Sequence, residues 1–177
     1  MTKAVPQSET VDTDRLQGGE KAHFWRRHDY DNLECLSANF TDHQYDLHTH
    51  DTFAFGVITA GTERFMCDGR EYVAKPGQLC LVHPGQVHDG GPADSGFTYR
   101  MFYPSVSLRT NRAYELRDGR DDMPTFANPV IDDPILADIA VELHKRLEAQ
   151  PDSMAIDQAL EQMLAMLIDR QMATEDW

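Results

Sequence analysis

The chain has 177 residues, of which 41% are hydrophobic, and a formal net charge of −14. This size and composition favour one well-buried folded domain over a disordered chain. The excess of negative charge argues against direct binding of a nucleic acid backbone, because that binding depends on clustered Lys and Arg.

Residues 1–20 are polar, and we expect them to form an arm ahead of the folded domain. This stretch lacks the basic start and apolar centre of a secretory signal, and no run in the chain is long enough to cross a bilayer. We therefore expect a cytoplasmic protein without a membrane partner. Residues 24–27 and 34–40 alternate apolar and polar side chains and predict two short strands. Trp25, in the first strand, is placed either at the mouth of a binding pocket under the arm or as a cap on the core.

The next part of the chain predicts a meander of short strands separated by turns. The expected strands are residues 45–50, 53–59, 63–67, 71–74, 79–82 and 97–103. We predict turns at Ala60-Gly61, Asp68-Gly69, residues 75–78 and Pro84-Gly85, and a glycine-rich loop over residues 89–96. About eight short strands with closely spaced turns are typical of an antiparallel sandwich or barrel.

Residues 132–177 predict a helical segment of two amphipathic helices. Asp133-Pro134 is a typical helix start, and Gln150-Pro151 marks the expected break between the helices. The second helix carries an apolar stripe that either covers the barrel or pairs with a second subunit. We assign five residues of this stripe to a homodimer interface: Ile156, Leu160, Met163, Leu164 and Leu167.

Three histidines are the main candidates for a binding site. His48 and His50 must point to the same side of a strand, because successive side chains alternate between its faces. His88 follows the Pro84-Gly85 turn and is placed to join them. Three imidazoles can hold a divalent metal such as zinc, iron or nickel, or they can form hydrogen bonds to a small effector in an otherwise apolar pocket.

The last predicted strand supplies further candidates for the pocket. Tyr99, Met101 and Tyr103 share one of its faces, and Arg100 and Phe102 share the other. The sequence does not indicate which face points inward. We include Tyr99, Met101, Tyr103 and Trp25 with the three histidines as candidate ligand-binding residues. Three cysteines without C-x-x-C spacing suggest buried, reduced thiols rather than disulfides.

Four segments in this order resemble one known family. They are His48 to Gly61, Gly77 to His88, Phe97 to Pro104 and Asn128 to Pro134. Over roughly residues 21–172 the chain is similar to the N-terminal effector-binding and dimerisation domain of AraC/XylS-type transcriptional regulators. The resemblance implies a cupin-like antiparallel β-barrel of the jelly-roll type over residues 21–131, followed by helices that pair two subunits. It also implies an arm that folds over the pocket.

Complete members of that family bind DNA through a C-terminal helix-turn-helix module, and no basic segment of that kind is present here. We therefore expect a sensor domain, with DNA binding left to a longer parent protein. Metal-dependent cupin enzymes carry a glutamate four residues after the second histidine, where this chain has Ala54. We accordingly predict a small-molecule sensor with no catalytic residues and no required cofactor. The alternatives are a small three-histidine oxygenase or isomerase, and a structural oligomerisation domain with a collapsed barrel.

Overall fold

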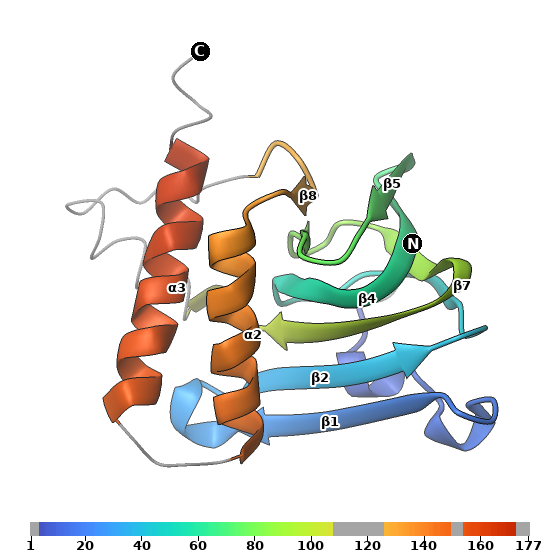
Figure 1. The fold of residues 1–177 in the computed structure, drawn as a ribbon, viewed down its shortest axis with the longest axis horizontal. Coiled ribbons are helices and arrows are strands. Elements are labelled where there is room, and N and C mark those ends of the chain that lie inside the picture. Colours follow the sequence, from blue (N-terminus) through green and yellow to red (C-terminus); the bar gives the residue numbers. More distant parts are fainter. Residues whose placement is uncertain (1–3, 108–125, 150–153, 173–177) are drawn as a thin grey trace.

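A computed structural model describes residues 4–107, 126–149 and 154–172. Residues 1–3 of the expected arm, and residues 150–153 and 173–177 of the expected helical segment, lie outside the described residues. The described chain forms one antiparallel β-sheet structure followed by two helices, α2 (Pro134–Ala149) and α3 (Met154–Met172) (Figure 1). The predicted fold class, mainly β with C-terminal helices, is confirmed.

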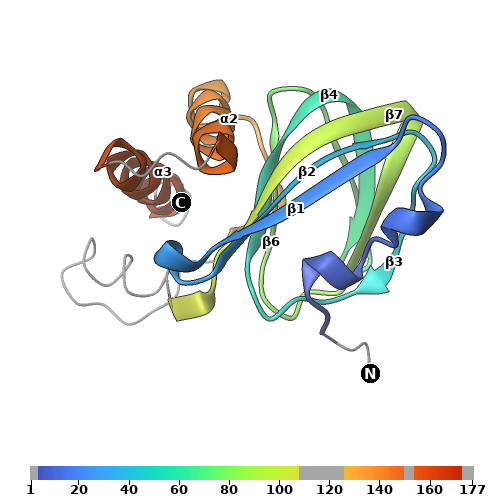
Figure 2. The ribbon, with the colours of Figure 1, turned by 90° about the horizontal axis from the view of Figure 1, so that it is seen from below.

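The sheet has eight strands, paired in the order β1-β2-β7-β4-β6-β8, with β3 beside β7 and β5 beside β4. Their bounds are β1 Lys21–Arg27, β2 Leu33–Phe40, β3 Tyr45–His48, β4 Ala54–Cys67, β5 Arg70–Ala74, β6 Leu79–Val82, β7 His88–Tyr103 and β8 Val130–Ile131. The strands β4 and β7 are long and pair with each other along both halves. Their second neighbours change along the strand: β6 and then β5 lie beside β4, and β3 and then β2 lie beside β7. Because both strands bend through the structure, the sheet curls over itself and encloses an interior (Figure 2).

Two glycines allow this bend. Gly61 in β4 and Gly96 in β7 both have positive φ, +68° and +119°. A Cβ atom on Gly61 would lie 2.1 Å from the carbonyl oxygen of Gly96, so only glycine lets the two strands approach this closely. The turn predicted at Ala60-Gly61 is therefore wrong: the strand continues through it with two register shifts. The predicted loop over residues 89–96 is also wrong, since these residues belong to β7.

The sheet has two apolar faces, and each belongs to its own core. The inner face, with side chains such as Ile58, Phe65 and Phe97, fills the curled interior. The outer face, with side chains such as Phe55 and Phe102, packs in one cluster with the helices. The carboxylate of Asp133 starts α2 by accepting a hydrogen bond from the Leu136 amide, 3.0 Å away.

The stripe on α3 lies in this outer core. All five residues assigned to a dimer interface, Ile156, Leu160, Met163, Leu164 and Leu167, are at most 6% exposed within the single chain. Their assignment to a dimer interface is wrong, because the helix α2 and the outer face of the sheet already cover them. The competing prediction, that the stripe packs on the chain's own barrel, matches the structure.

The arm lies against the end of the barrel and contains two short 3-10 helices, Gln7–Glu9 and Thr13–Arg15 (Figure 2). At its start, the Val5 amide donates to the carbonyl of Thr49, 2.9 Å away. At its end, one carboxylate oxygen of Glu20 accepts the backbone amides of residues 41–43, each at 2.8 Å. The described part of the arm is thus attached to the barrel at both ends.

Candidate functional site

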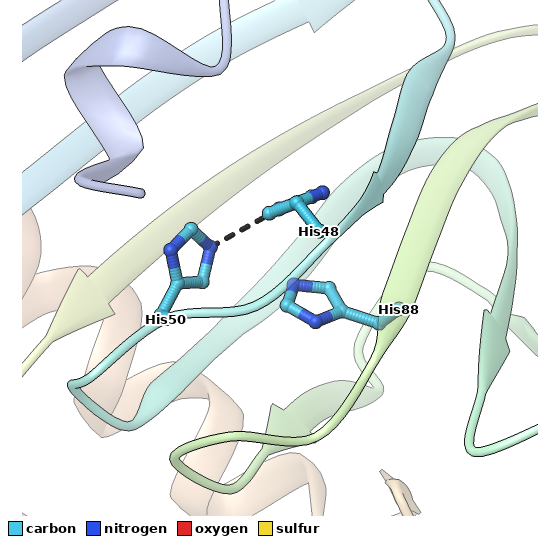
Figure 3. A group of neighbouring side chains, drawn as sticks. All are labelled: His48, His50 and His88. Atoms are coloured by element: carbon cyan, nitrogen blue, oxygen red, sulfur yellow. Dashed lines mark hydrogen bonds between the residues drawn. The ribbon is translucent and has the colours of Figure 1, made fainter. Parts of the chain in front are cut away.

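Three histidines meet inside the barrel. His48 ends β3 and pairs in register with His88, which begins β7, and His50 follows two residues after His48. The ring centroids are separated by 4.2 Å (His48 to His88), 4.7 Å (His48 to His50) and 5.1 Å (His50 to His88). Figure 3 shows the rings gathered around one space. The convergence predicted from strand alternation and from the position of the turn is confirmed.

Hydrogen bonds determine which ring nitrogen faces that space. The Nδ1 atom of His48 lies 2.6 Å from the carbonyl oxygen of Asp46, and that of His88 lies 3.0 Å from the carbonyl oxygen of Gln86. The Nδ1 atom of His50 lies 2.6 Å from the carbonyl oxygen of Val5, in the arm. A carbonyl only accepts, so each Nδ1 carries the proton and donates it. In the neutral rings, every Nε2 therefore presents a lone pair.

Burial keeps these rings neutral. Loss of hydration lowers the pKa of His48 and of His50, and it lowers the pKa of His88 to about 3, with the neighbouring imidazoles as a further cause. The Nε2 atoms of His48 and His50 are 3.2 Å apart, joined by the dashed line in Figure 3. A hydrogen bond at this distance needs a second proton on one of the rings, which burial disfavours, whereas a metal ion between the two lone pairs relieves their repulsion without that proton.

The arrangement fits a transition-metal ion. One nitrogen atom from each ring can serve as a ligand, and these three atoms lie within 4.8 Å of one another. Zinc, iron and nickel all accept neutral imidazole, and the carbonyls that fix the Nδ1 protons are the outer partners that metal-bound histidines usually have. A bound ion would supply a positive charge and open positions for water or another ligand.

A buried carboxyl group lies in the same cavity and was missed by the sequence analysis. Glu63 is 7% exposed, and the Cys80 thiol donates to its Oε2 atom, 3.4 Å away. Burial, with the nearby charge of Asp89, raises the pKa of Glu63 to about 7. Glu63 is not part of the group of described ligand atoms within 4.8 Å. The cavity thus holds a carboxyl group, although Ala54 stands at the position that the enzyme pattern requires.

The strand β7 places its predicted residues as one set. Tyr99, Met101 and Tyr103 all line the cavity, and the hydroxyl groups of Tyr45 and Tyr99 are 2.6 Å apart. Arg100 points to the outer face and forms an ion pair of 2.7 Å with Glu148 of α2. The sequence did not indicate which face of this strand points inward, and the structure shows that it is the face of Tyr99, Met101 and Tyr103.

Trp25 is not in the cavity, so its assignment to ligand binding is wrong. Its ring lies on the outer face of the sheet, 4.7 Å from the ring of His144 in α2, and it packs against the outer core. The strand β1 is at the edge of the sheet, beyond β2, and alternates its side chains: Ala22 and Phe24 pack against the inner core, whereas Trp25 points to the opposite side. Trp25 instead covers the outer core, which was the second position predicted for it.

One arm residue reaches into the cavity. The side chain of Gln7 is 5% exposed, and its Nε2 atom lies 3.4 Å from the hydroxyl of Tyr45. Its Oε1 atom is buried and has no hydrogen-bond partner among the described residues. The remaining cavity has a volume of about 40 Å³, which is room for about three water molecules.

A barrel with a small inner cavity that is lined by three histidines among apolar side chains, and partly covered by the chain's own arm, defines a ligand-binding barrel. The model of the AraC-like ligand binding domain matches residues 32–164, most of the chain. The chain belongs to this family, as the sequence resemblance predicted.

The individual proteins that resemble this chain have low sequence identity to it. The chain is 25% identical, over 126 residues, to the uncharacterized HTH-type transcriptional regulator YbfI of Bacillus subtilis, covering 71% of this chain. It spans about half, 46%, of the length of that relative. Among solved structures, a cupin-like protein of Thermotoga maritima has a TM-score of 0.48 at 18% identity, over 56% of this chain and 78% of the other. The Cnp3 cupin domain of Schizosaccharomyces pombe has a TM-score of 0.46 at 11% identity, over 67% and 82%.

None of the helices in the described ranges combines the length and the apolar character needed to cross a membrane.

Proposed function

We propose that this chain is the sensory part of a longer transcriptional regulator and acts in the cytoplasm as a homodimer. It binds a small effector in the barrel and contacts DNA only through a helix-turn-helix module outside these residues. The observation that supports this function is the family match over residues 32–164 together with a small cavity, lined by three histidines among apolar side chains, inside the matched barrel. The net charge of −14 agrees with leaving DNA binding to another module.

The arm is the element through which an effector would act. An effector shifts a conformational equilibrium only by the difference between its affinities for the two states. Gln7 and Val5 contact the cavity residues directly, so a cavity ligand necessarily interacts differently with the docked and undocked arm. The apolar stripe of α3 is buried within the chain, and the homodimer must therefore use another surface.

A metal-dependent enzyme is the second candidate, and Glu63 is the observation that favours it. Ala54 at the position of the expected glutamate argues against catalysis, but Glu63 lines the same cavity as the three histidines. Glu63 has a raised pKa, which is common among catalytic acids and bases. The sensor is preferred because the family is a ligand-binding one.

A ligand screen by thermal shift, with analysis of the recovered compounds, tests this function. We expect at least one ligand to raise the melting temperature of the chain and to be recovered unchanged. The response should be lost in His88→Ala and kept in His23→Ala, a histidine with a 62% exposed side chain outside the cavity. Recovery of a chemically altered compound would support the enzyme, and no response to organic compounds or metal ions would support a purely structural domain. Native mass spectrometry of the same sample tests the homodimer.

A further inference from the structure

We propose that the effector of this domain is itself a divalent transition-metal ion, bound by the Nε2 atoms of His48, His50 and His88. The inference rests on the proposed sensory function and names the chemical class of its ligand. In this role the metal is the signal, and the arm responds to its presence. Four features of the described residues support it: the size of the cavity, the charges in and around it, the spacing of two nitrogen atoms, and one hydrogen bond to the arm.

The cavity is too small for most organic effectors. Its volume is about 40 Å³, room for about three water molecules. A metal ion with one or two bound waters occupies that space. An organic effector with ten or more heavy atoms would have to displace the Gln7 side chain, and with it the start of the arm.

The charges in and around the cavity favour a cation. The polar lining of the cavity consists of the three histidines, Gln7, Glu63, Asp89, three tyrosines and a cysteine, with neither Lys nor Arg among the described lining residues. Two open grooves beside the arm are each lined by three carboxylates: Asp31, Glu34 and Asp51 in one, and Glu9, Asp12 and Asp46 in the other. The arginines of these grooves, Arg26 and Arg15, are paired with Glu34 and Asp12. The field at this end of the barrel therefore attracts cations and opposes anionic ligands.

The spacing of two nitrogen atoms distinguishes a metal ion from a hydrogen-bond donor. The Nε2 atoms of His48 and His50 are 3.2 Å apart. An ammonium group or a water about 2.9 Å from both would have to direct two hydrogens only about 67° apart, far below a tetrahedral angle. A metal ion about 2.1 Å from both nitrogens subtends about 100°, between octahedral and tetrahedral values. The spacing thus fits direct coordination and does not fit hydrogen bonding to a shared donor.

One ligand connects the ion to the arm. His48 and His88 donate their Nδ1 protons to carbonyls two residues earlier in their own segments, whereas His50 donates to Val5 in the arm. Coordination at Nε2 holds the proton on Nδ1 and strengthens it as a donor, so binding should tighten the bond to Val5. The unpartnered Oε1 atom of Gln7 lines the same cavity and can accept a hydrogen bond from metal-bound water. The occupied site therefore favours the docked arm.

The test uses the full chain, first freed of metal with a chelator and then titrated with ZnCl₂ or NiCl₂. Native mass spectrometry should show one ion per chain, and hydrogen exchange of arm residues 4–12 should slow. His88→Ala should abolish ion binding, and His23→Ala should bind like the wild type. Gln7→Ala should keep the stoichiometry but weaken affinity roughly tenfold, as is common for an outer-shell partner. Gln17→Ala, an exposed residue of the same arm, is its matched control.

Three results would overturn the inference. The first is the absence of an ion at micromolar concentration, and the second is binding that survives His88→Ala. The third is ion binding with unchanged exchange in the arm, which would make the ion a fixed cofactor. If an organic compound stabilises the metal-free chain and ions do not, this inference fails and the proposed sensory function stands. If neither an ion nor an organic compound binds, both fail.

Discussion

The substitution Met163→Ala should destabilise the folded chain by about 3 kcal/mol, since replacing a buried Met by Ala typically costs about 2–5 kcal/mol. Met163 is 0% exposed within the single chain and belongs to the outer core. Both the lost transfer free energy and the cavity left behind contribute. With a urea dependence of about 2 kcal/mol per molar, the unfolding midpoint should fall by about 1.5 M. Met154 is on the same helix but 75% exposed, so Met154→Ala should stay within about 0.5 kcal/mol of the wild type.

Urea unfolding followed by circular dichroism, at two protein concentrations tenfold apart, measures both effects. If the α3 stripe belongs to the core of one chain, the loss caused by Met163→Ala will be the same at both concentrations. A loss that grows on dilution would place the stripe in a subunit interface and refute the reasoning. The assignment of Met163 to the core would also be refuted if the losses of stability caused by Met163→Ala and Met154→Ala differed by less than about 1 kcal/mol.

Three further substitutions test other parts of the structure. Burial alone would raise the pKa of Glu20, but hydrogen bonds from the backbone amides, including residues 41–43, lower it to about 2. Since the folded pKa is depressed, its contribution is present above about pH 4.5 and is lost towards pH 2. We expect Glu20→Gln to cost about 1–2 kcal/mol at pH 7 and much less at pH 2, as measured by urea unfolding. For Glu63, burial raises the pKa to about 7, so wild-type stability falls as pH rises from about 4.5 through 7. In chelator, Glu63→Gln should melt higher than the wild type at pH 8 and equally at pH 4, and equal melting at both would contradict a buried ionisable carboxyl group. Gly61→Ala would place its Cβ 2.1 Å from a backbone oxygen, whereas Gly69, with φ +76°, has nothing within 4 Å. Urea unfolding should therefore show a loss for Gly61→Ala at least about 1 kcal/mol larger than for Gly69→Ala, and equal losses would count against the close strand approach.

Local periodicity predicted the parts of the site that depend on neighbouring residues. His48 and His50 share a face because they are two residues apart on an extended chain, and Tyr99, Met101 and Tyr103 share one for the same reason. Residue spacing shows which side chains share a face, but it does not show which face the helices cover and which face points into the barrel. Trp25 was misplaced for this reason, since only the packing of α2 shows which side of the sheet its strand presents.

Glu63 escaped prediction because β4 changes its alternation. Before the bend the inward residues are even-numbered, such as Ala54 and Ile58, and after it they are odd-numbered, such as Phe65. The two register shifts between Ile58 and Glu63 cause this change. A regular strand pattern carried forward from Ile58 would put Glu63 on the outside. Irregularities of this kind arise from tertiary contacts, here the close approach at Gly61.

The glycine-rich part of β7 was misread for a related reason. Gly90 and Gly91 look like loop residues, yet they lie in a strand where other groups come close. A Cβ on Gly90 would lie 2.8 Å from Oε1 of the buried Glu63. At Gly90 the absence of a side chain thus leaves room for this carboxyl group rather than making a turn, and the sequence alone does not distinguish these two uses.

The strand β7 has consequences for any attempt to change what the barrel binds. Its successive residues serve two different neighbours: Met101 and Tyr103 line the cavity, while Phe102 between them stacks on Phe55 beneath the helices, with ring centroids 4.9 Å apart. The backbone carbonyl of Met101 also accepts a hydrogen bond from His144 of α2, 3.0 Å away. Substitutions that enlarge the cavity at Met101 or Tyr103 therefore also disturb the packing of α2 on the outer face of the sheet. Binding specificity and domain stability have to be optimised together in this strand, whereas changes at Gln7 alter the cavity from a separate segment.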